Sequence, residues 1–358
     1  MTQVSELGGA ERACLALSHW LSMQGIPNHF VTYYETAGLA HIVCPPIEVV
    51  QLKPPLRPIA KIAALSRFVA THGNQYQPLM SGYQPALHAT LAGVRGFHCL
   101  MHDTPSLFSY GPESQRPRSR VQRWISDQIT GYGLRSGGRT IVTSEYLRKE
   151  SRRVFRVNAD VARMGGLGST HGFRPRPAGP TLRMLSVSRI ETNKRVDWML
   201  RALSAMEHAP APLSSKVDWR LDIAGKGSQL EVMRAISTEL GLDRRVHFHG
   251  FVSDADLEQL YATADLFLMP AVQGYGIPAI ESLQRGIPVL LHRDSGVSDL
   301  LLHTPWATVI EGGEEAMLPA LQNAIACVRA NQQVHAPLPN IPTEDRWAEQ
   351  VATLCGWL

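Results

Sequence analysis

Short apolar runs alternate with amphipathic segments through the second half of the chain. Five runs of the strand type lie at residues 184–187, 221–224, 246–248, 266–269 and 288–291. The segments between them carry apolar residues three and four positions apart, as helices with one buried face do. Strands that are apolar at nearly every position belong to parallel sheets covered by helices on both faces. The pattern predicts a doubly wound, Rossmann-like α/β domain over residues 183–335.

The first half of the chain repeats this pattern less regularly. A helix is predicted at about residues 10–24, and strands are predicted at 29–34, 97–101 and 140–143. We interpret residues 1–170 as a second Rossmann-like domain.

A segment rich in glycine and proline separates the two halves. The stretch GGLGSTHGFRPRPAGP (165–180) has the composition of a linker, which we place at 171–182. A terminal helix is predicted at 343–358, packing back towards the N-terminal domain. We expect the two domains to face each other across a cleft formed by the carboxyl ends of their strands, where such sheets bind ligands. This organisation indicates an enzyme with two substrates.

The composition places the chain among soluble globular proteins. Its 358 residues exceed one ordinary core, and 44% are hydrophobic and 18% charged. No apolar run is long enough to span a bilayer, and the N-terminus lacks the pattern of an export signal. Five scattered cysteines without a CxxC pair favour reduced thiols over disulfides or a zinc site. We therefore expect a cytoplasmic protein.

Positive charge is concentrated in residues 116–156. This segment holds eleven basic and three acidic side chains, whereas the whole chain has a net charge of +4. Such a concentration attracts phosphates, an anionic bilayer or nucleic acid, although a solvated arginine-rich face is the simpler alternative. Because few aromatic residues are interleaved and no nucleic-acid motif occurs, we predict no nucleic-acid partner. Of the binding interpretations, peripheral contact with the anionic inner face of a membrane is favoured over nucleic acid, and the solvated face stays open beside it.

A glycine-rich bend precedes one of the predicted helices. Gly274-Tyr275-Gly276 connects the strand at 266–269 to a helix at 278–285. The free N–H groups at the start of a helix carry partial positive charge and bind phosphate. A plain tight turn is the alternative interpretation of this motif.

Two cations follow the first strand of the same domain. Arg189 and Lys194 lie just before the next predicted helix, at the sheet edge where the glycine bend is expected. Arginine supplies a fork of donors and lysine a compact charge, so the pair suits an anion held from the opposite side. Exposed loop charges are again the alternative.

With these motifs in place, the chain resembles the retaining family-four glycosyltransferases of GT-B fold, the glycosyl transferases group 1. Four blocks carry the resemblance in the family's order: SRIETNK (188–194), DIAGKGSQLEVM (222–233), RVHFHGFVSDADLEQLYATADLFLMP (245–270) and QGYGIPAIESLQRGIPVL (273–290). LGGAERACLALSHWL (7–21) and GFHCLMHDTPS (96–106) are more loosely similar to the acceptor-side blocks. The resemblance covers nearly the whole chain.

The resemblance implies a site for a nucleotide-diphosphate sugar. Arg189 and Lys194 would hold the diphosphate against the glycine bend, Glu281 would bind the ribose hydroxyls, and His102 would face the donor sugar. The residues that it places on the donor are Gly8, Gly9, Arg189, Lys194, Gly250, Phe251, Val252, Gly274, Tyr275, Gly276, Ile277 and Glu281. The catalytic set that it implies is His102, Gln273, Arg189 and Lys194. Gly225-Lys226-Gly227 would support the nucleotide from a neighbouring loop.

In the mechanism that the resemblance implies, the acceptor hydroxyl attacks from the face that the diphosphate leaves, and a phosphate oxygen takes its proton. The protein then needs no nucleophile, no metal and no cofactor. Its task is to stabilise the leaving diphosphate and to position the two substrates. The acceptor would be a sugar, a lipid-linked molecule or a small molecule, and the nucleotide base, the donor sugar and the oligomeric state stay open.

Two positions depart from the family's pattern. Gln273 stands where the family has a glutamate, and a glutamine cannot lend negative charge to an oxocarbenium-like centre. Three alternatives follow: catalysis relies on the diphosphate, the donor sugar is bound differently, or the protein is a weak or inactive homologue that acts as a binding partner or scaffold. The first strand is also short, because only Met1–Val4 precede the glycine block, so a short strand or an upstream start is expected.

Overall fold

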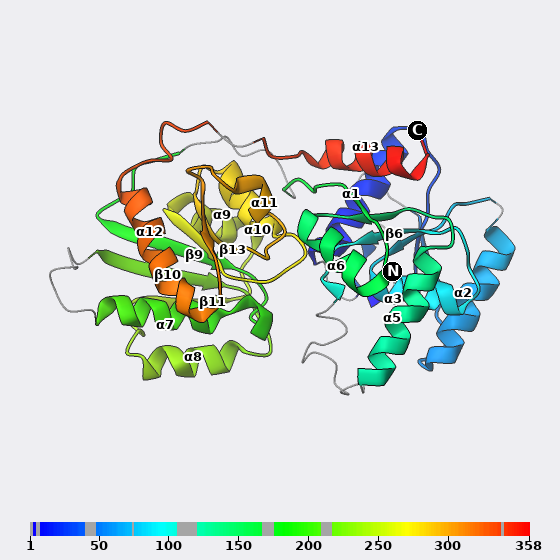
Figure 1. Cartoon of the computed structure of the whole chain (residues 1–358), viewed down its shortest axis with the longest axis horizontal. Helices are drawn as coiled ribbons and strands as arrows, with labels where there is room; N and C mark the ends of the chain where they lie inside the picture. The colour runs from blue at the N-terminus through cyan, green and yellow to red at the C-terminus, as the bar shows by residue number, and fades with distance from the viewer. Residues whose placement is uncertain are drawn as a thin grey trace. The chain divides into compact units, whose positions relative to one another are not determined.

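The structure is a computed structural model that describes residues 3–4, 8–39, 48–73, 75–105, 120–166, 175–208, 217–337 and 340–358. Its internal contacts divide the chain into two units. The first comprises Met1–Leu167 and Pro342–Leu358, and the second Gly168–Ile341 (Figure 1). The terminal helix therefore belongs to the first unit.

The described residues of the second unit form one parallel sheet of six strands. The sheet has the order β11-β10-β9-β12-β13-β14, and every neighbouring pair is parallel. The strands are β9 (Thr181–Val187), β10 (Asp218–Ala224), β11 (Val246–Gly250), β12 (Leu266–Met269), β13 (Val289–His292) and β14 (Ala307–Ile310). This is the order of a doubly wound dinucleotide-type domain, as the alternating pattern predicts.

Helices cover both faces of this sheet (Figure 1). They are α7 (Val196–Glu207), α8 (Leu230–Glu239), α9 (Asp254–Thr263), α10 (Ile277–Gln284), α11 (Ser298–Leu301) and α12 (Met317–Arg329), with the short 3₁₀ helices η2 (Thr192–Lys194) and η3 (Glu314–Ala316). The apolar faces of α7, α8 and α12 share one core with the sheet. Every residue of β12 and β13 is buried, which explains their uninterrupted apolar runs. Each such aliphatic side chain contributes roughly 1.5–3 kcal/mol on burial.

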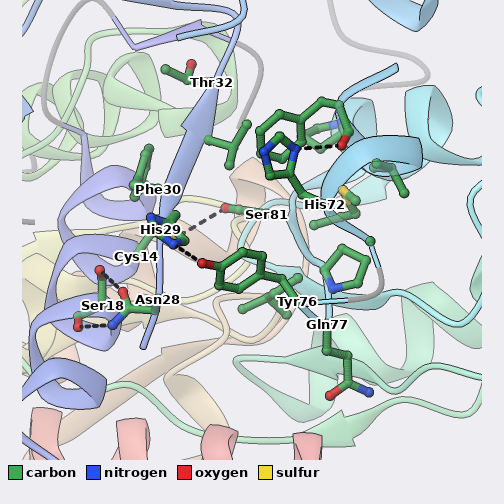
Figure 2. A pocket seen from close by; sticks show the side chains of 18 of the residues that line it. Cys14, Ser18, Asn28, His29, Phe30, Thr32, His72, Tyr76, Gln77 and Ser81 are labelled. Carbon is green, nitrogen blue, oxygen red and sulfur yellow. Dashed lines mark hydrogen bonds between the residues drawn. The ribbon is translucent and has the colours of Figure 1, made fainter. Parts of the chain in front are cut away.

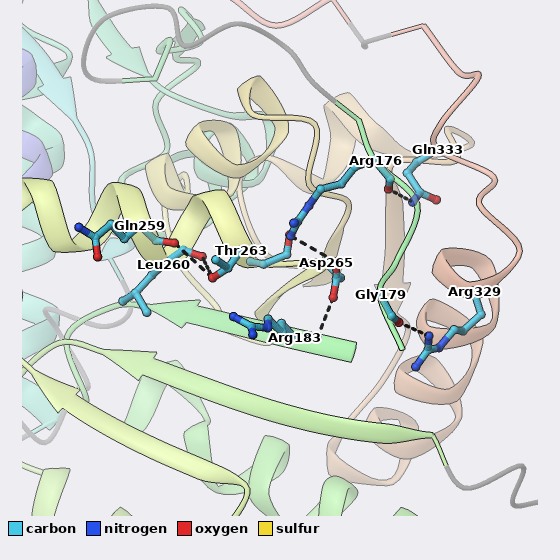
Figure 3. Close-up of polar contacts among 10 residues, drawn as sticks. Arg176, Gly179, Arg183, Gln259, Leu260, Thr263, Asp265, Arg329 and Gln333 are labelled. Atoms are coloured by element: carbon cyan, nitrogen blue, oxygen red, sulfur yellow. Dashed lines mark hydrogen bonds and ion pairs between the residues drawn. The ribbon is translucent and has the colours of Figure 1, made fainter. Parts of the chain in front are cut away.

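The start of the second unit is tied down by polar contacts (Figure 3). Arg176 pairs with Asp265 Oδ1 at 3.2 Å and donates to the carbonyl of Ala264 at 2.7 Å. The second carboxylate oxygen of Asp265 accepts the backbone N–H of Arg183 at 2.8 Å. These contacts fix the part of the predicted linker that is described, and they give Asp265 a structural role. Residues 171–174 of the linker lie outside the described residues.

The described residues of the first unit form three parallel strand groups. They are the sheet β5-β6-β7-β8 and the pairs β2-β4 and β1-β3. The strands are β1 (Gln3–Val4), β2 (Phe30–Thr32), β3 (Tyr34–Glu35), β4 (Val49–Gln51), β5 (Leu79–Ser81), β6 (His98–Met101), β7 (Thr140–Val142) and β8 (Asp160–Val161). The strand predicted at 29–34 is thus two strands, because the pairing changes at Tyr33 from β4 to β1.

Six described helices of the first unit carry the remaining core. They are α1 (Gly9–Met23), α2 (Pro58–His72), α3 (Tyr83–Leu91), α5 (Arg120–Leu134), α6 (Glu145–Phe155) and α13 (Glu344–Cys355). The terminal helix α13 packs on α1 and buries Trp347 and Val351. Gln350 of α13 also donates to the carbonyl of Val161 at 3.0 Å. None of the described helices is long and apolar enough to cross a membrane.

Candidate functional site

The predicted lysine clamp meets the predicted glycine loop in the second unit. Lys194 ends the 3₁₀ turn that follows β9, and its Nζ donates to Oε1 of Gln273 at 2.6 Å. Lys194 and Gln273 are 79 positions apart in the sequence, and both side chains are partly buried. The contact brings a cation to the loop between β12 and α10, at the carboxyl ends of two neighbouring strands of the sheet.

Gln273 is held at both its backbone and its side chain. Its carbonyl accepts the N–H of Gly296 at 3.1 Å, within a bridge to Ser295. Its side-chain amide donates to Sδ of Met269 at 2.8 Å while the oxygen accepts from Lys194. The amide is therefore oriented, with its oxygen on the side of the cation.

The bend itself requires glycine at its last position. Gly276 caps α10 with φ at 129°, a conformation that residues with a side chain rarely adopt. A Cβ there would lie 2.6 Å from Cε of Met269 and 2.8 Å from Nε2 of Gln273. Tyr275 is buried, and Ile277 and Pro278 open the helix. Because Gly276 has no side chain, it does not shield the backbone of the bend. A phosphate-binding loop needs its backbone accessible in this way.

Arg189 lies on the same loop as Lys194, five positions earlier, and its side chain is exposed. Its neighbour Ile190 donates its N–H to the carbonyl of Lys226 at 2.8 Å. A Cβ on Gly225 would lie 1.8 Å from the carbonyl oxygen of Ser188, and one on Gly227 would lie 2.1 Å from that of Ile190. The two glycines therefore let the loops after β9 and β10 touch, which fixes the backbone that carries Arg189.

Glu281 projects from α10, one helical turn after Ile277. Its Oε2 accepts the hydroxyl of Tyr261 at 3.1 Å. Burial, followed by the charge of Glu281, raises the pKa of Tyr261 well above its usual value, so the phenol stays protonated and donates. The guanidinium of Arg285 pairs with Glu258 and stacks on the ring of Tyr261. Tyr261 thus orients the Glu281 carboxylate and Arg285 holds the ring of Tyr261, although no motif in the sequence singled out either residue.

Gly250, Phe251 and Val252 follow β11 at the edge of the sheet. The carbonyl of Gly250 accepts the N–H of Gly225 at 2.7 Å, and Gly250 has φ at 68°. The ring of Phe251 is 75% exposed, and Nζ of Lys226 lies 5.5 Å from its centroid. An aromatic ring presented in this way can stack on a planar base.

A polar cavity of about 480 Å³ adjoins Phe251 and Val252. Arg220 and His249 both contact Oδ1 of Asp222 in its wall, at 3.2 Å and 2.7 Å. No motif in the sequence indicated this cavity, because its residues come from three strands, a loop and a helix that are separated along the chain.

The site residues predicted in the first unit lie at the carboxyl end of β6 and at the N-terminus of α1. His102 directly follows β6, and its Nε2 is 3.9 Å from Sγ of Cys14, whose thiol donates to Ser81 at 3.1 Å. Burial lowers the pKa of His102 to about 4, so the imidazole is neutral at pH 7. Its Nδ1 is buried without a hydrogen-bond partner among the described residues. A neutral imidazole can donate one hydrogen bond and accept another, as a sugar hydroxyl requires.

Gly8 and Gly9 begin helix α1. Gly8 is the exposed N-cap, and a Cβ on it would lie 2.7 Å from Oε2 of Glu11. Gly8 itself supplies no side-chain cap, and the carboxylate of Glu11 lies beside the start of α1. In the parts of the chain that are described, no group of three His, Cys, Asp or Glu side chains could hold a metal ion.

Comparison with known proteins identifies the second unit. Residues 173–328 match the family of glycosyl transferases group 1. The second unit is a group 1 glycosyltransferase domain. This domain carries Arg189, Lys194, the glycine bend and Glu281, all within the matched residues.

Among curated proteins, the chain is similar to a GDP-mannose-dependent alpha-(1-6)-phosphatidylinositol monomannoside mannosyltransferase of Mycobacterium tuberculosis. The two are 27% identical over 197 residues, which cover 49% of this chain and 49% of the mannosyltransferase. The chain spans less than half the length of the curated relatives it matches.

Two solved structures share the fold over nearly the full chain. WaaG, a glycosyltransferase involved in lipopolysaccharide biosynthesis, has a TM-score of 0.73 at 16% identity and covers 99% of this chain and 98% of its own. Anabaena Alr3699/HepE, solved with UDP and glucose, has a TM-score of 0.69 at 17% identity, covering 100% of this chain and 99% of its own. At these identities the likeness establishes the fold, which is that of the GT-B glycosyltransferases.

Proposed function

We propose that the protein is a retaining glycosyltransferase that moves a sugar from a nucleotide-diphosphate sugar to an acceptor hydroxyl. The observation that carries the proposal is the 2.6 Å contact between Lys194 and Gln273 beside the glycine bend of a group 1 domain. This contact puts a positive charge next to a helix start that has glycine as its N-cap. Cations and backbone N–H groups together stabilise a departing diphosphate, which is the main demand of the reaction.

In this proposal the predicted donor residues have distinct roles. Arg189 and Lys194 bind the diphosphate from one side. The backbone N–H groups of Gly274–Gly276 bind it from the other side. Glu281, oriented by Tyr261, accepts the ribose hydroxyls, and Phe251 stacks on the base. His102 hydrogen-bonds a hydroxyl of the donor sugar, and Gly8 and Gly9 let α1 approach the substrates. The mechanism uses no metal or other cofactor, so chelation with EDTA leaves the rate unchanged.

The acceptor is proposed to be bound to a lipid, at the inner face of a membrane in the cytoplasm. Helix α5 presents Val121, Trp124 and Ile125 with exposures of 64%, 61% and 44%. Arg120 on the same helix is exposed as well, so basic and apolar groups share one surface. Residues 116–119 of the basic segment lie outside the described residues. The name of the mycobacterial relative also specifies a lipid acceptor for that protein.

Sedimentation with vesicles tests the membrane contact. The protein is expected to sediment with vesicles rich in anionic lipid and to stay in solution with neutral ones. Trp124→Ser should weaken sedimentation severalfold, whereas Val232→Ser, which alters an exposed apolar residue on α8, should leave it unchanged. Equal sedimentation of the two variants would remove α5 from the contact.

A second function is favoured by one observation, namely that position 273 holds a neutral amide. In this alternative the chain binds a nucleotide sugar without turning it over and supports an active partner. Gln273→Glu decides between the two, because it restores the charge at the position that contacts Lys194. If only the variant hydrolyses the donor or transfers its sugar, the natural chain binds the nucleotide sugar without turning it over.

The proposed activity is tested by incubating the protein with UDP-, GDP- and ADP-sugars and following the released diphosphate by mass spectrometry. We expect hydrolysis of one donor, with retention of the anomeric configuration in the product. Lys194→Met should abolish the signal, and Lys149→Met, at an exposed position of α6, should not. An inverted product would exclude the retaining mechanism.

A further inference from the structure

The start of helix α2 carries the two most exposed large apolar side chains among the described residues. Leu56, two positions ahead of the helix, is 79% exposed, and Ile59 in its first turn is 81% exposed. The residues around them, 55 and 57–58, are exposed as well. We call residues 53–61 the α2 tip. Apolar side chains grouped in water in this way mark a surface that meets a partner or a membrane.

The charged residues around the α2 tip are all basic. Residues 49–73 contain Lys53, Arg57, Lys61 and Arg67 and no aspartate or glutamate. Lys53 and Arg57 are exposed and lie on either side of Leu56 in the sequence. Basic groups beside exposed apolar ones are typical of a segment that lies in the interface of an anionic bilayer, where the cations meet the lipid head groups. The charge of the α2 tip therefore favours a lipid surface as its partner.

The backbone holds the α2 tip in a defined conformation. Lys53 has φ at 41°, in the left-handed region that residues with a side chain rarely adopt. Pro54 and Pro55 follow it, and Pro58 opens the helix, so φ is fixed at three of the next five positions. Leu56 is therefore presented in one direction, and little conformational entropy is left to lose when the α2 tip meets a surface.

Helices α2 and α5 begin at the same edge of the first unit. Helix α2 ends at His72, shortly before β5 begins at Leu79, and α5 ends at Leu134, shortly before β7 begins at Thr140. Because β5 and β7 belong to one parallel sheet, each helix runs back along it and begins near the edge where the strands end. Both helices pack on α3, which lies between them (Figure 1).

This edge also carries His102. His102 directly follows β6, a strand of the same parallel sheet. The exposed apolar side chains of α5, Val121 and Trp124, join Leu56 and Ile59 at this edge. A bilayer that receives both helix starts therefore lies along the edge of the first unit where His102 is found.

The inner side of α2 is held by few buried side chains. Among the described residues of α2, only Ala64 and Leu65 are buried. An apolar cavity of about 330 Å³ lies under the helix, lined by Leu65, Phe68 and Val69 and by residues of α1, β2 and β5 (Figure 2). Sparse contacts of this kind give an element a low local stability. A second contact at the α2 tip would therefore stabilise the helix measurably.

We propose that the α2 tip inserts Leu56 and Ile59 into the interface of an anionic bilayer, alongside the start of α5. Lys53 and Arg57 bind the phosphate groups of the lipids. The inference rests on the membrane contact of α5 proposed above and adds a second element to it. Two contacts along one edge fix the orientation of the first unit on the bilayer, with the edge that carries His102 towards a lipid-linked acceptor.

Sedimentation with vesicles of phosphatidylglycerol compares two double variants. Leu56→Ser/Ile59→Ser changes the α2 tip, and Met23→Ser/Leu91→Ser changes two exposed apolar side chains at the C-terminal ends of α1 and α3. The first variant should bind at least about tenfold more weakly than the wild type, because it loses the burial of two aliphatic side chains. The second should bind as the wild type does. Both should keep the Tm of the wild type, because the side chains are exposed.

Two further measurements separate insertion from attraction to the surface. Ile59→Trp and Leu91→Trp each add one tryptophan to the seven of the chain. With vesicles of brominated phosphatidylglycerol, quenching beyond that of the wild type should appear for Ile59→Trp and not for Leu91→Trp. Amide hydrogen exchange along α2 should slow by at least about threefold on these vesicles. Arg57→Gln should weaken binding by roughly fivefold at low salt.

Distinct results would overturn the proposal. If Leu56→Ser/Ile59→Ser binds vesicles as the wild type does while Trp124→Ser binds more weakly, α5 alone makes the contact. If the wild type itself does not bind anionic vesicles, the proposed membrane contact fails together with this inference. If Leu56→Ser/Ile59→Ser changes the oligomeric state and leaves vesicle binding unchanged, the α2 tip belongs to an interface with a second copy of the chain.

Discussion

The side chain of Gln273 lies beside Lys194, Met269 and Gly276 in the loop between β12 and α10. Its oxygen accepts from Lys194, its amide donates to Met269, and its Nε2 lies 2.8 Å from where a Cβ on Gly276 would be. A charge-assisted hydrogen bond of this kind contributes roughly 1.5–3 kcal/mol. In the proposed function, Lys194 would exchange the amide oxygen for a phosphate oxygen when a diphosphate binds. The position thus keeps the cation in place in the free protein.

Gly276→Ala should destabilise the second unit and weaken diphosphate binding together. The substitution forces a side chain into φ at 129° and towards Met269 and Gln273. A backbone strain of this type costs about 1–3 kcal/mol, measurable by urea unfolding. Gly179→Ala is the matched control, because its Cβ would have only an ordinary contact at 3.7 Å. Equal unfolding midpoints for the two variants would contradict the strained bend.

His102 gives a pH dependence with a defined sign. Its pKa is lowered by burial from 6.5 to about 4, so the unfolded chain binds a proton that the folded chain rejects. The stability contributed by neutral His102 is complete above pH 6.5 and is lost as the pH falls towards 4, by no more than about 1.4 kcal/mol per pH unit.

Comparison with His102→Gln isolates this effect from other groups. Between pH 6.5 and 4 the free energy of unfolding of the wild type should fall more steeply than that of the variant. Parallel curves for the two proteins would mean that His102 titrates normally in the folded state.

At the scale of elements, the strands that are buried along their whole length were the ones that the sequence predicted directly. The strands β12 and β13 are buried at every position, so their apolar runs predicted them directly. The strand at 29–34 was predicted as one element, because a change of pairing partner at Tyr33 leaves no mark on the local pattern. Motif spacing likewise did not predict the roles of Tyr261 and Arg285, because these residues act through partners that are distant in the sequence. The sequence did predict that Lys194 and the glycine bend lie at one edge of the sheet, because each follows one of two neighbouring parallel strands, β9 and β12.

Helix α13 illustrates how a distant segment completes a core. Trp347 is 1% exposed and belongs to the helix that packs on α1. Trp347→Ala should lower the free energy of unfolding by about 3–5 kcal/mol, measured in urea, because it opens a large cavity. Trp124→Ala is its counterpart on α5, where the ring is 61% exposed, and should change stability by less than about 0.5 kcal/mol. Similar losses for both would show that α13 does not contribute a core.

At the scale of the whole molecule, the two units carry different parts of the proposed chemistry. The second unit holds the cations, the glycine bend and Glu281, and the first holds the neutral His102 and the start of α1 at Gly8. The basic residues of α5 and α6 also belong to the first unit, so the proposed membrane surface and the proposed diphosphate site lie on separate units. This separation predicts that membrane-binding variants leave nucleotide binding unchanged.

The central claim is that the second unit binds a diphosphate group between Lys194 and the glycine bend. Isothermal titration of the full chain with UDP, GDP and ADP, in the presence of EDTA, measures it most directly. We predict that at least one of these nucleotides binds, and that Lys194→Met weakens that binding by roughly 10- to 100-fold, as the loss of a charged hydrogen bond implies. Lys149→Met should bind as the wild type does. Binding of no nucleoside diphosphate, or equal affinity of Lys194→Met and wild type, would contradict the account.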